Sequence, residues 1–286
     1  MATTVAGSFD RFRANLEITA PQQSTVSTRQ QNVRDAVARR LRVKDSFVTG
    51  SYSRHTMIAP LSSADIDVFV VLDPTYYAVD AYATLLDRVR NALLETYTKT
   101  PRISRNGQAV TITFTDFVVD VVPAFYRKGG GYLIPSTIEK QWISTDPKVH
   151  ETFITSANSS HSGQLVPLIK MIKGWNRGIS STFRSFYLEL LVEQVLRGVT
   201  ISDFPSGCRY VFDKGRETIK YKIFDPAGLG AQVNGIDVGT VAQAVSRFET
   251  ALSRARRAEG FAAVGNVSAA VTEWRKVFGD YFPAYG

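Results

Sequence analysis

The decisive stretch of sequence is Gly50-Ser51-Tyr52-Ser53-Arg54-His55-Thr56-Met57-Ile58, followed by Ala64-Asp65-Ile66-Asp67-Val68-Phe69-Val70-Val71-Leu72. The second run begins with two carboxylates one residue apart and continues as an apolar, β-branched segment typical of a strand. Because side chains alternate between the faces of a strand, Asp65 and Asp67 point to one face, while Ile66 and Val68 point to the other. Two carboxylates held side by side repel each other unless a cation lies between them or one is protonated.

The residue types around this pair favour phosphoryl chemistry on a nucleotide. Mg²⁺ prefers oxygen ligands and is typically held by one or two carboxylates together with substrate phosphates. The Gly50–Ser51 turn just upstream can direct backbone N–H groups and a hydroxyl at such phosphates. We therefore expect Gly50 and Ser51 to bind donor phosphates, and the Asp65/Asp67 pair to bind a divalent metal.

A third carboxylate, Asp120, lies in the apolar run from Val110 to Phe125. The run predicts two strands with a break near Asp116, and Pro123 is expected to end the second strand. An unpaired charge inside such a strand is costly, and a metal shared with Asp65 and Asp67 would offset that cost. Three carboxylates on adjacent strands can hold two Mg²⁺ or Mn²⁺ ions, which activate a hydroxyl nucleophile and stabilise an in-line phosphoryl displacement.

Each of these signals has a purely structural alternative. An Asp-x-Asp at the start of a strand is often a solvated edge, and a buried Asp often caps a neighbouring backbone segment. The Gly-Ser turn, the Asp-x-Asp pair and the distant Asp, occurring in this order with strand-like sequence around them, are together far more specific than any one of them.

The sequence resembles the polymerase-β-like nucleotidyltransferases, which share the Gly-Ser, Asp-x-Asp and distant Asp pattern. The residues around these motifs are similar to those of the bacterial cGAS/DncV-like nucleotidyltransferases (CD-NTases), above all in Gly50–Ile58, Asp65–Phe69 and Asp120-Val121-Val122-Pro123-Ala124-Phe125. The similarity extends to Trp274–Gly279 and Phe282-Pro283 near the C-terminus. The resemblance implies synthesis of a cyclic di- or trinucleotide second messenger from NTPs in anti-phage CBASS defence.

The second half of the chain offers candidates for the rest of a nucleotide site. Lys170 and Lys173 fall on one face of an otherwise apolar helix, where an ammonium group needs an anionic partner such as a donor γ-phosphate. The alternative is that both lysines reach past apolar neighbours to water. The segment Ser185-Phe186-Tyr187-Leu188-Glu189 resembles a family motif whose serine contacts phosphate and whose aromatic residue stacks on the base. The resemblance therefore implies phosphate binding by Ser185 and base stacking by Phe186.

The composition is that of an ordinary globular protein. The chain has 286 residues, 44% of them hydrophobic and 21% charged, with a formal net charge of +8. This charge suits nucleotides, and it leaves nucleic acid as a further candidate partner. Cys208 is the single cysteine, so no intrachain disulfide can form. We find no apolar run of about 18 residues and no signal-peptide pattern, and therefore expect no membrane association and a cytoplasmic location.

We expect an α+β fold in which a polymerase-β-like lobe, a mixed sheet with helices, packs on a mainly helical lobe with the active site in the cleft. The catalytic lobe is predicted to span 1–150, including an N-terminal helix, and the nucleotide-binding lobe 151–286. A basic amphipathic helix is predicted over 27–42, with Ser27 as its N-cap.

Two other functions share parts of this evidence. A template-independent RNA-tailing or CCA-adding nucleotidyltransferase would use the same carboxylates. An inactive nucleic-acid-binding protein with a transferase fold would explain the basic helix. Within the favoured function, the bases joined, the linkage, the ring size and the activator stay open. Conjugation of Gly286 to another molecule by a partner enzyme is a further expectation suggested by the resemblance.

Overall fold

A computed structural model describes residues 3–100, 102–229, 232–233, 235–236 and 239–286. The chain forms two compact units. One, here called the sheet unit, comprises Ile18–Phe153 and Asp225–Ala231. The other, the helical unit, comprises Met1–Glu17, Ile154–Phe224 and Gln232–Gly286. In this division, residues 1–17 group with the helical unit. The functional lobes 1–150 and 151–286 stay a prediction.

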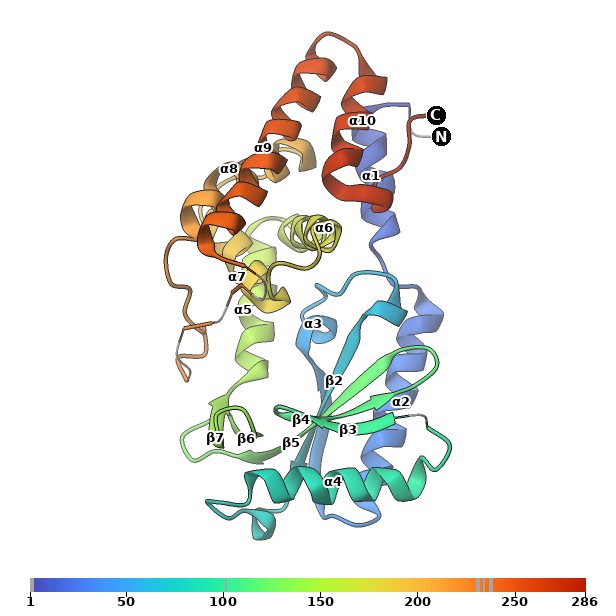
Figure 1. The fold of residues 1–286 in the computed structure, drawn as a ribbon, viewed down its shortest axis with the longest axis vertical. Helices are drawn as coiled ribbons and strands as arrows, with labels where there is room; N and C mark the ends of the chain where they lie inside the picture. The colour runs from blue at the N-terminus through green and yellow to red at the C-terminus, as the bar shows by residue number, and fades with distance from the viewer. Residues whose placement is uncertain (1–2, 101, 230–231, 234, 237–238) are drawn as a thin grey trace. The chain divides into compact units, whose positions relative to one another are not determined.

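Within the described residues, the sheet unit contains a seven-stranded mixed sheet in the order β1-β2-β5-β4-β3, with β6 on β5 and β7 on β6 (Figure 1). β2 and β5 run parallel, and the other pairs are antiparallel. The strands are β1 (Val43–Thr49), β2 (Asp65–Leu72), β3 (Arg102–Asn106), β4 (Ala109–Thr113), β5 (Val118–Tyr126), β6 (Tyr132–Ser136) and β7 (Gln141–Thr145).

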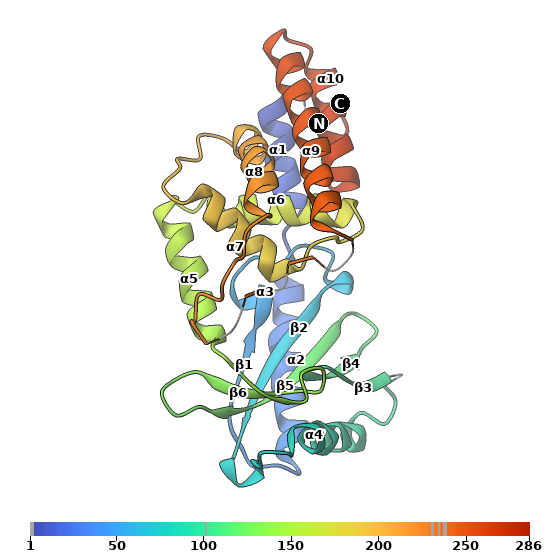
Figure 2. The same cartoon turned by 60° about the vertical axis from the view of Figure 1, so that its left-hand side comes forward.

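Helices α2 (Ala20–Ala38) and α4 (Tyr82–Thr96) cover one face of this sheet (Figures 1 and 2). Ile66 and Val68 of β2 point into this core and are at most 1% exposed, packed among residues that include Val33 of α2 and Leu86 of α4. This alternation leaves Asp65 and Asp67 on the opposite face. The short helix α3 (Gly50–Ser53) connects β1 to the segment that leads into β2.

Helix α2 begins earlier than its sequence pattern predicts. Its N-cap is Thr19 rather than Ser27: the Thr19 Oγ1 accepts the Gln22 N–H at 3.4 Å, and the Gln22 side chain accepts the Thr19 N–H at 2.8 Å. This capping box satisfies two N–H groups of the first turn. The prediction of the start was wrong because the first turns are polar, with Val26 the first buried side chain, so apolar periodicity could not reveal them.

Pro123 does not end its strand, contrary to the sequence prediction. β5 continues to Tyr126, and Pro123 is the Cα partner of Val70 in the parallel ladder. On the other edge of β5, the ladder with β4 stops at Val121 and the ladder with β6 starts at Phe125. Pro123 lies between these two ladders, so its missing N–H leaves no ladder hydrogen bond unmade on that edge.

The helical unit contains α1 (Val5–Asn15), α6 (Leu165–Gly178), α7 (Ser185–Leu196), α8 (Phe204–Thr218), α9 (Val241–Ala263) and α10 (Val267–Phe278), and the division between the units falls within α5 (Pro147–Ser160). Phe9 and Phe12 anchor α1 here. Phe9 lies 5.0 Å from Trp274 between ring centroids, and Phe12 lies 4.5 Å from Phe278. Figure 1 shows α1 beside α10. Among the described helices, none combines the length and apolar character needed to cross a bilayer.

Candidate active site

The sheet register brings the three predicted carboxylates together. Asp67 of β2 and Asp120 of β5 are direct Cα partners in the parallel ladder. Asp65 lies two positions before Asp67 and therefore on the same face of the sheet. The next residues on this face, Phe69 and Val122, are also direct partners and are nearly buried. The carboxylates thus stand at one end of this sheet face, next to an apolar pair of residues.

Burial disfavours charge at all three carboxylates, and repulsion between carboxylates adds to this effect at Asp67 and Asp120. Burial, together with the charges of Asp120 and Asp65 and against the charge of Arg54, raises the pKa of Asp67 to about 7. Burial, aided by Asp65, raises the pKa of Asp120, against the hydrogen bond that the Thr111 hydroxyl donates to it. Burial likewise raises the pKa of Asp65. A cation between these side chains would relieve both effects.

The Gly50–Ser51 turn lies directly against Asp67. A Cβ placed on Gly50 would fall 1.8 Å from the Asp67 Oδ2 atom, and Gly50 has a φ of +70°, which disfavours other residues. The backbone N–H groups of Thr56 and Met57 both donate to the Ser51 carbonyl, at 2.9 and 3.0 Å. These bonds hold the turn in place beside the carboxylate.

The residues on this face fit a divalent cation by their chemistry. Asp65, Asp67 and Asp120 supply hard oxygen donors, and burial raises the pKa of each of them, so a divalent cation would favour their charged forms. Among the described residues, no three His, Cys, Asp or Glu side chains are already gathered at ligand spacing.

The raised pKa of Asp67 predicts how the stability of the metal-free protein depends on pH. Because the folded-state value of about 7 exceeds the usual 3.8, the folded protein holds a proton that the unfolded chain releases. This stabilisation is complete below the unfolded pKa and is lost as the pH rises through about 7. In EDTA we expect the free energy of unfolding to fall by a few kcal/mol between about pH 5 and 8. Chemical denaturation across this range measures it.

Substitution of Asp67 by Asn should remove most of that fall, because the variant has no proton to lose at this position. Adding Mg²⁺ should stabilise the wild-type protein more at pH 8 than at pH 6. A pH slope that is the same in the wild type and in Asp67→Asn would contradict the assignment.

The four predicted nucleotide-binding residues of the second half lie on α6 and α7 in the helical unit. Lys170 Nζ lies 2.7 Å from Glu17 Oε2, and Lys173 Nζ lies 2.9 Å from Glu189 Oε1. Both lysine side chains are less than a tenth exposed, so neither simply extends into water. Ser185 is the first residue of α7, and Phe186 follows it half-buried. Phosphate binding by the lysines and Ser185, and stacking by Phe186, stay predictions.

Three further polar residues interact with the carboxylates of the sheet unit or the predicted nucleotide-binding residues of α6 and α7. The sequence had suggested no role for any of them. Arg54 is 6% exposed and lowers the pKa of Asp67. Thr111 is the Cα partner of Asp120 on β4 and bonds to its carboxylate. Glu189 is completely buried and pairs with Lys173. The polar alternation of β4 pointed to Thr111, and a glutamate within the apolar α7 pointed to Glu189, whereas the burial of Arg54 left no local signal.

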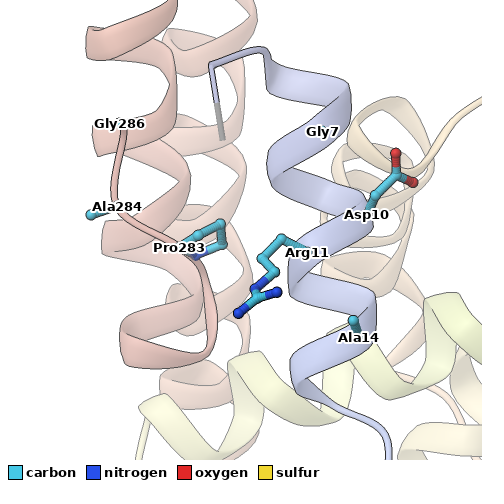
Figure 3. A pocket seen from close by; sticks show the side chains of 7 residues that line it. All are labelled: Gly7, Asp10, Arg11, Ala14, Pro283, Ala284 and Gly286. Carbon is cyan, nitrogen blue, oxygen red and sulfur yellow. The ribbon is translucent and has the colours of Figure 1, made fainter. Parts of the chain in front are cut away.

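A separate cavity of about 640 Å³ lies in the helical unit, between α1 and the C-terminal tail (Figure 3). Its lining consists of Gly7, Asp10, Arg11, Ala14, Pro283, Ala284 and Gly286. The Arg11 side chain extends toward the tail, whereas Asp10 points away from it. With a single carboxylate, this cavity does not offer the donor set of a metal site, and the carboxylates of the sheet unit remain the candidate catalytic centre.

Comparisons with known proteins identify relatives that match most of the chain. The cyclic AMP-AMP-AMP synthase of an Acinetobacter species is 28% identical over 256 residues, which cover 83% of this chain and 72% of that protein. A probable cyclic nucleotide synthase of Bacillus cereus is 25% identical over 275 residues, covering 85% and 83%.

Solved structures share the fold. Escherichia coli MS115-1 CdnC with ATP has a TM-score of 0.80 at 19% identity, covering 99% of this chain and all of that one. Vibrio cholerae DncV, a cyclic AMP-GMP synthase, has a TM-score of 0.70 at 16% identity, covering 84% and 69%. These similarities confirm the predicted α+β fold.

The family evidence covers more than half of the sequence. The family model of the Second Messenger Oligonucleotide or Dinucleotide Synthetase domain matches residues 3–158, which include the Gly-Ser turn and all three carboxylates. The chain therefore belongs to the second-messenger oligonucleotide or dinucleotide synthetase family, and it is a nucleotidyltransferase related to the CBASS cyclic oligonucleotide synthases.

Proposed function

We propose that the protein joins NTPs into a cyclic di- or trinucleotide with release of pyrophosphate, in a reaction that depends on two Mg²⁺ or Mn²⁺ ions. The observation that carries this proposal is the row of Asp65, Asp67 and Asp120 on adjacent parallel strands, with the Gly50 backbone against Asp67. The family and the NTP complexes of structural neighbours support it: CdnC was solved with ATP, and DncV with the linear intermediate pppA(3′,5′)pG.

Each residue has a defined part in the proposed reaction. Asp65, Asp67 and Asp120 would hold the metal ions, whose chemistry is to activate the attacking ribose hydroxyl and to neutralise charge on the phosphates. Gly50 and Ser51 bind the donor phosphates. Lys170, Lys173 and Ser185 hold the triphosphate tail, and Phe186 stacks on the donor base, a contact that tolerates any base.

The reaction consists of two or three equivalent transfers. The acceptor hydroxyl oxygen forms a bond to the donor α-phosphorus, the bond from that phosphorus to pyrophosphate breaks, and the hydroxyl proton is released. The linear product retains a 5′-triphosphate at one end and free ribose hydroxyls at the other, one of which attacks in the closing step. After it turns round in the site, the same chemistry joins its two ends and closes the ring.

The proposal is tested with purified protein, labelled ATP, GTP, CTP and UTP, and Mg²⁺ or Mn²⁺. Phosphatase treatment follows, because a closed ring has no terminal phosphate to remove. We expect a small phosphatase-resistant product that is absent from an Asp65→Ala/Asp67→Ala control, and omission of one NTP at a time identifies its bases. Failure to form this product with any NTP set, activator or phage-infected lysate would contradict the proposal.

The two alternatives give different results when RNA or DNA is added to this assay. An RNA-tailing enzyme would lengthen added RNA instead of making a small product. An inactive nucleic-acid-binding protein would bind RNA or DNA without turnover. Against the latter, four arginines of the basic segment around α2 already pair with carboxylates of the sheet unit: Arg29 with Asp116, Arg34 with Asp35, Arg40 with Glu95 and Arg42 with Asp73.

Anti-phage defence and a cytoplasmic location are part of this proposal, as is control by an activating ligand. Conjugation through Gly286 is a separate element. Deletion of Gly286, with immunoblotting of cell extracts for higher-mass forms, tests it: unchanged conjugates would remove Gly286 from the account.

A further inference from the structure

Two residues of the helical unit that are predicted to bind phosphate donate hydrogen bonds to the same buried carboxylate oxygen. Lys173 Nζ lies 2.9 Å from Glu189 Oε1, and the Ser185 hydroxyl donates to the same oxygen over 3.4 Å. Lys173 comes from α6, whereas Ser185 and Glu189 lie one turn apart on α7. Glu189 is 0% exposed and Lys173 is 7% exposed. The carboxylate therefore joins the two helices at the point where both donors lie.

Glu189 is an acidic residue within an apolar stretch of α7, where Leu188, Leu190 and Leu191 are all buried. A buried ion pair is often no more stabilising than apolar residues of similar size, because both charges lose their hydration. The pair is better explained by what it does for the position of Lys173.

We propose that Glu189 is a positioning residue that fixes the Lys173 ammonium and the Ser185 hydroxyl for the donor triphosphate. The inference rests on the proposed function, which places the triphosphate at these two donors. An ammonium group has three N–H donors, so Lys173 can keep its bond to Glu189 while donating to phosphate oxygens. Ser185 has one O–H and must release Glu189 to reach phosphate. Its 3.4 Å bond is long, so this exchange costs little.

Helix α7 provides a matched control in Glu193, one turn after Glu189. Glu193 is 6% exposed and is paired with Arg197 through two hydrogen bonds of 3.0 and 2.7 Å. Its partner lies on the same segment rather than on α6. Glu193→Gln thus removes a similarly buried, ion-paired carboxylate from the same helix without changing the surroundings of Lys173 or Ser185.

The test compares Glu189→Gln with Glu193→Gln in the full-length protein. We expect Glu189→Gln to raise both the KM for NTP and the dissociation constant of a fluorescent ATP analogue about 10-fold or more, the effect of a misplaced charged hydrogen bond, with a smaller change in kcat. Glu193→Gln should change both constants less than about 2-fold. Glu189→Asp, which keeps the charge, should recover part of the loss. Thermal melting of each variant reports on folding.

A double substitution shows whether Glu189 acts through Lys173. If it does, Lys173→Met/Glu189→Gln should bind the ATP analogue no more weakly than Lys173→Met alone, because groups that act as a unit are not additive. Glu189→Gln leaves the buried Lys173 ammonium without this carboxylate. The double variant also removes that ammonium, so the test stays usable if Glu189→Gln folds poorly. Multiplicative losses in the double variant, or wild-type binding by Glu189→Gln, would overturn the positioning role.

Failure of this inference is distinguishable from failure of the proposed function. If the wild type binds NTP without forming a cyclic product, the proposed reaction is wrong and the binding comparison still decides the role of Glu189. If the wild type forms the product and Glu189→Gln has wild-type constants, only the positioning role is wrong. If the wild type binds no NTP, both are overturned.

Discussion

Replacement of Asp67 by Asn is expected to lower the rate of nucleotide joining by at least about 10³-fold while leaving the protein folded. Asn has the size of Asp but not its charge. Both proposed metal ions therefore lose a negatively charged ligand. The free energy of unfolding should not fall, because burial and Asp120 already disfavour the charge at this position. Turnover and chemical denaturation, measured on one preparation at pH 8, separate the two effects.

Asp45→Asn is the matched control for this experiment. Asp45 lies on the adjacent strand β1 opposite Val71, four positions along β2 from Asp67, and its carboxylate accepts the Ser46 N–H at 2.8 Å. This variant should retain turnover within about 2-fold of the wild type. If Asp67→Asn kept wild-type turnover, or lost it only by unfolding, the catalytic role of the carboxylate row would be refuted.

Gly50→Ala is expected to lower turnover about 10²-fold or more, because displacement of a catalytic group by about 1 Å has effects of that size. The new Cβ would lie 1.8 Å from the Asp67 Oδ2 atom, so the carboxylate or the turn must move. The positive φ of Gly50 adds a conformational cost of about 1–2 kcal/mol for any other residue. Steady-state kinetics and melting temperatures measure the two consequences.

Gly163→Ala separates backbone strain from displacement of Asp67. Gly163 has a φ of +77°, close to that of Gly50, but a Cβ added there would have no atom within 4 Å. This control should lose a similar amount of stability from strain alone and keep its turnover. Equal activity losses in the two variants would show that the contact between Gly50 and Asp67 has no special importance.

The carboxylate row could be predicted from the sequence because it follows from strand alternation. Asp65 and Asp67 share a face by their spacing alone, and the apolar runs around them and around Asp120 identified both strands. The sequence does not contain the register between these strands. That Asp67 and Asp120 are direct partners depends on how β2 and β5 align across the sheet.

Other features depend on contacts between distant segments. The docking of α1 on the helical unit rests on rings more than 250 positions apart, Phe9 with Trp274 and Phe12 with Phe278, and no local pattern reveals such pairs. The short strands β6 and β7 have little periodicity of their own and depend on pairing with β5 and with each other. The partner of Lys173 was likewise hidden, because Glu189 follows it by 16 positions on another helix.

The most direct test of the account is the ratio of pyrophosphate released to nucleotide incorporated in the phosphatase-resistant product. Each phosphodiester bond releases one pyrophosphate, and a ring has as many bonds as nucleotides, so the predicted ratio is one to one. The mass of the product should equal that of the joined nucleoside monophosphates less one water per bond, and Asp67→Asn should form none. A ratio below one with a linear product that loses its 5′-phosphates to phosphatase, or a product that Asp67→Asn still makes at the wild-type rate, would contradict the central claim.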